Sequence, residues 1–226
     1  MVLQMIGIEH EKVPLEIREQ FAFQTHEGKE AMGFLKDTYG LFVKELDKAL
    51  AEGRVDICVH SLKDLPMEIP AKLPIVCFSK REDPRDVLLL KAGGDETIGS
   101  GIIGTSSNRR KIQLKRLYPK AEFKGIRGNV QTRLRKLEEE DYTATVLARA
   151  GLMRLEMENV IARTFSVEEM IPAAGQGILA VQGRMGEDYS YLNGIHSQAS
   201  AYMAEAERGF VATCVDRTIK PGIKAE

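Results

Sequence analysis

Hydroxyl and arginine side chains gather where one expected strand gives way to an expected helix. Thr105, Ser106 and Ser107 follow an apolar strand, and Arg109 and Arg110 fall in the first turn of the helix after it. The hydroxyls can cap that helix and leave its first backbone N–H groups available to a ligand. Because an arginine at a helix start opposes the helix dipole, the pattern favours a bound anion over a merely solvated basic helix start.

A similar arrangement occurs in the next strand–helix unit. The turn there contains Gly128, with Arg127 at the strand end and Arg133 on the helix, and Arg149 and Arg154 extend the set with less specificity. The planar guanidinium group suits bidentate recognition of carboxylates, so convergent arginines indicate a ligand with several carboxylates. A phosphate ligand or a simple turn with surface arginines remains an alternative, although the chain lacks the GxxxxGK(S/T) and GxGxxG motifs.

One acidic side chain accompanies these cations, in the segment HSLKDLP at residues 60–66. Asp64 follows Lys63 just after a short buried strand. An aspartate in positive surroundings stays ionised, and it can stabilise a cation or accept an N–H hydrogen bond. A simple loop role for Asp64 fits the spacing equally well. His60 is a candidate general base, but a structural hydrogen-bond donor is the favoured interpretation for a histidine leaving a buried strand.

The elements that must position these residues alternate between strand and helix, which predicts an α/β protein with parallel sheets flanked by helices. The expected strands are residues 1–8, 55–59, 73–79, 87–90, 101–104, 122–126, 143–147 and 178–182. The expected helices are residues 15–21, 28–36, 41–50, 108–117, 130–139 and 195–213. The glycine-rich stretch 93–101 predicts a linker or surface loop with a domain junction nearby. Because ligands of open α/β sheets bind at the carboxyl ends of strands, the polar loops should meet at one cleft.

The composition argues against nucleic-acid binding, membrane binding and metal binding as functions. The 226 residues carry a formal net charge of -1, and 43% of them are hydrophobic. That balance supplies no field for nucleic acid or an acidic membrane, so neither is expected as a partner. Three scattered cysteines, Cys58, Cys77 and Cys214, predict neither a disulfide framework nor a zinc site, and no metal is expected. With no signal-peptide pattern and no long apolar run, we expect a cytoplasmic protein.

Eight stretches from about residue 39 onward carry a family resemblance. They are GLFVKELDKAL, VDICVHSLKDLP, KREDPRDVLL, IIGTSSNRRKIQL, IRGNVQTRLRKL, LARAGLMRL, PAAGQG and AERGF. In this order they resemble the porphobilinogen deaminase family, also called hydroxymethylbilane synthases. Members of that family join four porphobilinogen molecules head to tail, with loss of ammonia at each step. The resemblance implies a transferase of tetrapyrrole and haem biosynthesis whose substrate carries acetate and propionate groups.

The resemblance also implies roles for individual residues. Asp64 would contact pyrrole N–H groups and stabilise the cationic intermediate formed on deamination, with Lys63 as its catalytic neighbour. The residues implied to bind substrate or cofactor carboxylates are Ser61, His60, Thr105, Ser106, Ser107, Arg109, Arg110, Arg127, Gly128, Arg133 and Arg154.

The family carries a dipyrromethane cofactor on a cysteine, and this chain departs from that pattern. The aligned position is Thr218, whose hydroxyl is a poorer nucleophile than a thiolate. Cys214, one helical turn upstream, is an unlikely substitute. Two functions therefore stay open: an active hydroxymethylbilane synthase, and an impaired or inactive member that binds porphobilinogen or polypyrroles.

The fold implied by the resemblance is that of the periplasmic binding proteins, with a cleft between two α/β domains and a small third domain. Residues 39–82 and 178–198 would form the first domain, 83–177 the anion-binding second domain, and 199–226 a helix and a truncated start of the third. Residues 1–38 instead resemble the N-terminus of glutamyl-tRNA reductase, so the first domain should be atypical there. The family pattern also leads us to expect a monomer.

Overall fold

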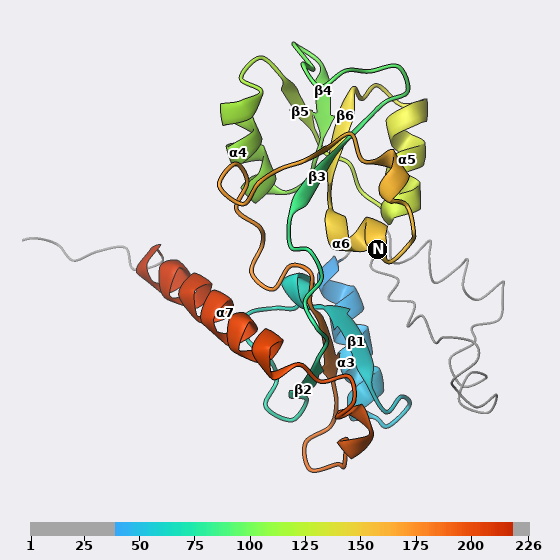
Figure 1. Ribbon diagram of the computed structural model, residues 1–226. Helices are drawn as coiled ribbons and strands as arrows, with labels where there is room; N and C mark the ends of the chain where they lie inside the picture. The colour runs from blue at the N-terminus through green and yellow to red at the C-terminus, as the bar shows by residue number, and fades with distance from the viewer. Residues whose placement is uncertain (1–38, 219–226) are drawn as a thin grey trace, which may run out of the picture.

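The computed structural model describes residues 39–218, which form two lobes, each built around its own β-sheet (Figure 1). Two segments, residues 79–85 and 165–178, connect the lobes. The strand expected at residues 1–8 and the helices expected at 15–21 and 28–36 lie outside the described residues.

The lobe at the bottom of Figure 1 contains a three-stranded sheet in the order β1-β8-β2. Its strands are β1 (Cys58–Ser61), β2 (Ile75–Phe78) and β8 (Leu179–Gln182), and β8 pairs antiparallel with both neighbours. The accompanying elements are α3 (Tyr39–Ala51), α7 (Gln198–Thr218) and the 3-10 turns η1 (Leu62–Asp64) and η3 (Ser190–Leu192). Ala204 of α7 packs with Leu62 and Leu65, so the core of this lobe anchors the turn that carries Lys63 and Asp64.

The other lobe contains a five-stranded sheet in the order β5-β4-β6-β3-β7. The strands are β3 (Asp86–Leu90), β4 (Ile102–Gly104), β5 (Glu122–Lys124), β6 (Ala144–Ala148) and β7 (Arg163–Thr164). β4 pairs parallel with β5 and β6, whereas β3 pairs antiparallel with β6 and β7. The helices and the 3-10 turn are α4 (Asn108–Leu117), α5 (Val130–Glu139), α6 (Arg149–Met153) and η2 (Glu158–Val160).

The two faces of this sheet are both covered. Side chains alternate along a strand, and Leu88 of β3 lies in the core cluster that includes Leu114 of α4. Its neighbour Leu89 lies in the cluster that includes Leu137 of α5. α4 and α5 therefore cover opposite faces, as Figure 1 shows. Burial on both faces explains why β3 is apolar after its first residue.

Two helices begin and end where the sequence predicted them, whereas the helices expected at 41–50 and 195–213 begin at residues 39 and 198. α4 and α5 span residues 108–117 and 130–139, so both expected helices are confirmed. The Ser107 hydroxyl accepts a hydrogen bond from the Arg110 N–H at 3.4 Å, and the Asn129 side chain accepts one from the Thr132 N–H at 2.7 Å. These caps are local, so short sequence patterns specify them.

The two connecting segments run against each other at a glycine. The Glu82 N–H donates to the Gly177 carbonyl at 3.1 Å. Gly177 has a φ of +93°, and a Cβ there would lie 2.4 Å from the Glu82 carbonyl oxygen. Gly175, with a φ of +71°, approaches Leu62 in the same way, since a Cβ would lie 2.6 Å from that side chain. The glycines of PAAGQG thus permit the lobe junction to close.

Three features differ from the sequence expectation. The lower sheet is antiparallel and the upper sheet is mixed, so the expectation of parallel sheets is wrong for the first and only partly right for the second. β8 is reached after the chain has crossed to the upper lobe and returned, and it enters between β1 and β2 in the opposite direction. Residues 93–101 connect β3 to β4 within one sheet and mark no domain junction.

The strand expected at residues 55–59 is also displaced, because β1 spans Cys58–Ser61. The Val55 carbonyl accepts a hydrogen bond from Arg184 at 2.6 Å, a side chain that follows β8. The Val55 carbonyl is therefore bonded to a side chain at a position where the apolar pattern predicted a strand.

Gly177→Ala tests the contact between the connecting segments. The matched control is Gly186→Ala, at a φ of +88° with open space around the glycine. Both variants incur the left-handed backbone strain of about 1–2 kcal/mol, but only Gly177→Ala adds a clash with Glu82. We expect Gly177→Ala to lower the free energy of unfolding more, as measured by urea denaturation. Equal losses in the two variants would contradict the close approach.

Candidate functional site

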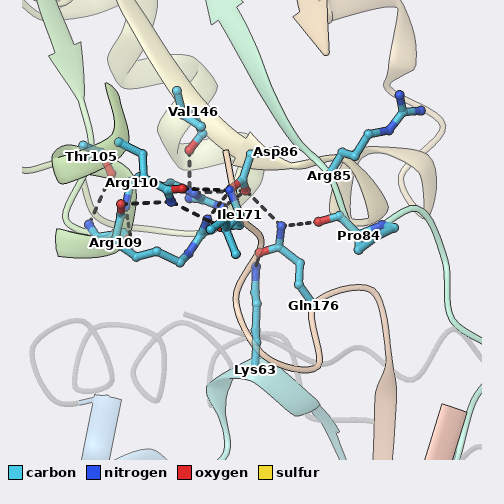
Figure 2. A network of polar contacts seen from close by, with 12 residues as sticks. Lys63, Pro84, Arg85, Asp86, Thr105, Arg109, Arg110, Val146, Ile171 and Gln176 are labelled. Carbon is cyan, nitrogen blue, oxygen red and sulfur yellow. Dashed lines mark hydrogen bonds and ion pairs between the residues drawn. The ribbon is translucent and has the colours of Figure 1, made fainter. Parts of the chain in front are cut away.

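A buried carboxylate lies at the centre of the polar network at the lobe junction (Figure 2). Asp86, the first residue of β3, has no exposed surface. Nε and Nη2 of Arg110 donate to its Oδ1 at 3.1 and 2.8 Å, and Nη1 of Arg109 lies 2.7 Å from its Oδ2. Burial acts to raise the pKa of Asp86, but the charges and hydrogen bonds of Arg110 and Arg109 outweigh it and hold that pKa below its ordinary value.

This carboxylate explains the two arginines at the start of α4. The sequence pattern favoured a bound anion there, and the structure supplies one from the protein itself. Arg110 is buried and also donates to the Val146 carbonyl at 2.9 Å, so its guanidinium is committed to the fold. Arg109 is the more exposed of the pair and reaches the Ile171 carbonyl as well. Of these two arginines, Arg109 is therefore the one placed to meet a ligand.

Gln176 extends the network across the junction. Its Nε2 donates to Asp86 Oδ1 at 3.0 Å and to the Pro84 carbonyl at 2.6 Å. Its Oε1 accepts from Lys63 Nζ at 3.3 Å, so a side chain of the lower lobe is tied to the upper sheet (Figure 2). Burial, together with the charge of Arg110, lowers the pKa of Lys63 to about 8. Lys63 is thus a charged amine near neutral pH that loses its proton more readily than an exposed lysine.

The residues around Lys63 divide between two faces of β1. Ser61 is half-buried at the strand end, whereas His60 points to the opposite face and is 3% exposed. Burial lowers the pKa of His60, which favours the neutral ring. The structure thus places His60 inside the lower lobe, away from the face that carries Ser61. Asp64 follows in η1, and its charge acts to raise the pKa of Lys63.

A pocket of about 460 Å³ opens beside the start of α4. Its lining is Thr105, Ser106, Ser107, Asn108, Lys111, Phe123, Gly125, Arg127 and Lys136. The charged members of this lining are all cations, from α4, from the turn after β5 and from α5. Hydroxyls and cations around one hollow can bind carboxylates or other oxyanions.

The hydroxyls of that pocket are held in place by the backbone. Thr105 Oγ1 accepts from the Ser107 N–H at 3.2 Å, and Ser106 Oγ donates to the Ile126 carbonyl at 2.9 Å. Ser106 remains exposed, as does Arg127 across the pocket. The pocket is therefore preformed on the side of the hydroxyls and open to solvent at its arginine.

The remaining arginines hold main-chain carbonyls or acids. Arg133 Nε donates to Gly128 at 2.8 Å, and Gly128 itself has a φ of +122°. Arg154, at the end of α6, donates through Nη2 to the carbonyl of Gly177 on a connecting segment at 2.8 Å. Arg149 pairs with acids at 3.1 and 3.2 Å. These three arginines are bonded within the protein at separate places, so the structure does not gather all the predicted arginines at one point.

Sequence reasoning missed Asp86 and Gln176 as members of the site. An acid that opens an apolar strand was the available signal for Asp86, since a buried carboxylate requires a cationic partner. Gln176 sits between two glycines of PAAGQG and carries no charge that would have marked it.

Cys214 and Thr218 lie on α7. Cys214 is exposed, and Thr218 ends the helix with its side chain outside the described residues. Within residues 39–218, no group of three or more His, Cys, Asp or Glu side chains is arranged to hold a metal ion. No helix in the same range has the length and apolarity of a membrane span.

Known proteins resemble this chain over most of its length. The family model described as "Porphobilinogen deaminase, dipyromethane cofactor binding domain" matches residues 18–191, and so includes part of the segment compared above with glutamyl-tRNA reductase. A porphobilinogen deaminase from Acetivibrio thermocellus is 55% identical over 172 residues, which cover 76% of this chain and 59% of the relative. One from Burkholderia thailandensis is 45% identical over 173 residues, which cover 75% and 53%.

The chain spans less than two thirds of the length of these relatives. Among solved structures, a TRAP periplasmic solute binding protein from Desulfovibrio salexigens gives a TM-score of 0.42 at 11% identity, covering 77% of this chain and 64% of that one. That likeness is too weak to establish a shared fold.

Asp86→Asn tests the electrostatic link between Asp86 and Lys63. The negative charge of Asp86 acts to raise the pKa of Lys63, so its removal should move that pKa further below about 8. The pH dependence of amine labelling at Lys63, followed by peptide mass spectrometry, measures the change. Asp64→Asn should shift it in the same direction, and the exposed Glu205→Gln on α7 should leave it unchanged. An unchanged or higher Lys63 pKa in Asp86→Asn would contradict the network.

Proposed function

This chain belongs to the porphobilinogen deaminase family, and we propose that it condenses porphobilinogen head to tail into a linear tetrapyrrole with release of ammonia. One observation carries the proposal: a continuous network ties Lys63, beside Asp64 on one lobe, to Asp86 and the arginine pair on the other. The three cations Lys63, Arg109 and Arg110 outnumber the two acids Asp64 and Asp86, so this network keeps a surplus of one positive charge. That surplus suits a substrate with two carboxylates, and Asp64 suits a cationic intermediate.

The substrate carboxylates bind, in this proposal, where cations and hydroxyls are accessible. At the junction these groups are Lys63, Arg109 and Ser61, and in the pocket they are Ser106, Ser107 and Arg127. Thr105 and Arg110 support them, because both side chains are buried. Arg133 and Arg154 are assigned a supporting role because they donate to the Gly128 and Gly177 carbonyls.

The chemical step breaks one C–N bond and forms one C–C bond. The protonated aminomethyl group of porphobilinogen leaves as ammonia with the bonding electron pair, and the remaining methylene carries a positive charge shared with the pyrrole ring. Asp64 accepts a hydrogen bond from the pyrrole N–H, and its negative charge stabilises that cation. The methylene then bonds to the unsubstituted ring carbon of the next pyrrole, which loses a proton.

The family's dipyrromethane cofactor fits the chemistry of these side chains. Two pyrroles with an acetate and a propionate each present four carboxylates, and the pocket and the junction offer two separate sets of cationic donors. When bound, the cofactor supplies the pyrrole carbon to which the first porphobilinogen is joined. We propose no attachment through Thr218, because a hydroxyl is a poor nucleophile without an adjacent base.

We further propose that the protein acts as a monomer in the cytoplasm. Porphobilinogen would then be its partner, with no nucleic acid or membrane involved. The formal net charge of -1 supports the proposal that neither nucleic acid nor a membrane is a partner, since it provides no general attraction to polyanions.

An intact mass spectrum and a turnover assay test the proposed function. We expect the purified chain to carry the mass of one dipyrromethane and to release ammonia from porphobilinogen as it forms a linear tetrapyrrole. Peptide mapping would locate the cofactor and decide whether Cys214 on α7, an unlikely substitute by sequence, carries it. A bare polypeptide mass with porphobilinogen binding but no ammonia would overturn the enzyme and favour a binding protein of the same family.

Asp64→Asn separates catalysis from binding. The amide keeps the shape of the carboxylate but removes the negative charge that stabilises the cation, so ammonia release should fall by at least ~100-fold. Porphobilinogen affinity, measured by calorimetry, should change little. The control is Glu68→Gln, an exposed acid four residues further along the chain, which should retain full turnover. Normal turnover in Asp64→Asn would refute its assigned role.

A further inference from the structure

One face of α7 lies against the turn that carries Lys63 and Asp64. Ser200, Ala204 and Arg208 recur every four residues and so share that face. Ser200 and Ala204 are each 1% exposed, and Ala204 packs with Leu62 of the turn. Arg208 is the next side chain along this face, and it begins where the apolar contact ends.

Arg208 binds a row of main-chain carbonyls on that turn. Its Nη1 lies 3.5 Å from the carbonyl oxygens of both Leu62 and Leu65. Its Nη2 donates to the Pro66 carbonyl and, at 3.0 Å, to the Met67 carbonyl. A planar guanidinium with donors on both edges can bridge several carbonyls at once, which a lysine ammonium cannot reproduce.

The exit of the turn is short of main-chain donors. η1 has three residues, and the Leu65 N–H after it donates to the Leu62 carbonyl at 3.2 Å. Pro66 has no N–H to donate. The Leu62 N–H is held by the Ile178 carbonyl at 3.0 Å, so the start of the turn is fixed by the sheet. Its exit therefore depends on Arg208.

The residue before Arg208 holds the other partner of Lys63. Glu207 accepts from Arg81 at 2.6 and 3.2 Å and from the Gly175 N–H at 2.8 Å. Gly175 precedes Gln176, whose side chain accepts the Lys63 hydrogen bond. Glu207 and Arg208, consecutive on α7, thus bind the two segments that meet at Lys63, namely the one with Gly175 and Gln176 and the turn at residues 62–67.

We propose that Arg208 is a positioning residue for the condensation: it fixes the turn so that Lys63 meets Gln176 and Asp64 keeps a constant place beside the cationic intermediate. The role of Arg208 in turnover rests on the proposed function. Its role in holding residues 62–67 in place is independent of that function. Arg208 belongs to the AERGF stretch, for which the sequence alone predicted no role.

Arg208→Gln and Arg208→Lys test the proposal by hydrogen exchange and kinetics. In Arg208→Gln we expect backbone exchange across residues 62–67 to accelerate at least tenfold, with exchange in β3 and β6 unchanged. Turnover should fall at least tenfold through kcat, because Asp64 is displaced rather than removed. Arg208→Lys keeps the charge but should not restore slow exchange, since the carbonyls need the forked donor.

Controls and contrary outcomes separate the two levels of the proposal. Glu205→Gln, on an exposed position of the same helix, should match the wild type in both measurements. Wild-type exchange at residues 62–67 in Arg208→Gln would overturn the positioning role, and so would full recovery in Arg208→Lys. If the wild-type chain releases no ammonia, the proposed function fails, while the exchange measurement still decides whether Arg208 holds the turn.

Discussion

A carboxylate without exposed surface is stable at Asp86 only because two guanidinium groups meet it there. Removing an ion from water costs several kcal/mol, and close pairing with hydrogen bonds is what offsets that cost. This requirement ties the first residue of β3 to the first turn of α4, and through Gln176 it reaches Lys63 on the other lobe. The junction between the lobes is therefore organised around one negative charge.

In the function that we propose, the same pairing divides the cations between structure and ligand. Arg110 is buried against Asp86 and Val146, and ligand binding is assigned to Arg109 and Lys63. The pocket lined by Ser106, Ser107 and Arg127 adds a second group of donors on the upper lobe alone. A ligand with several carboxylates can contact both groups, and those at the junction depend on how the lobes are held.

Close contacts of the connecting segments and of α7 hold the two lobes together. Gly177 lies against the Glu82 carbonyl and Gly175 against Leu62, at distances that no side chain permits. Glu207 of α7 binds the connecting segment at Gly175, and Arg208 binds the turn that carries Lys63. Each contact is small, but together they join three stretches that are distant in the chain and determine where Lys63 and Asp64 lie.

The sequence by itself determined the family, the bounds of α4 and α5, and the kinds of groups at the strand ends, because caps and periodicity act over a few neighbouring residues. It indicated an anion at the start of α4 but not which one. Only the tertiary structure decided that Asp86, 24 positions before Arg110, is that anion, that Gln176 meets Lys63 across 113 positions, and that His60 turns inward. These contacts follow from the packing of α4 against β3 in the upper lobe, from the burial of one face of β1, and from the meeting of the two lobes at Gln176, none of which a local pattern encodes.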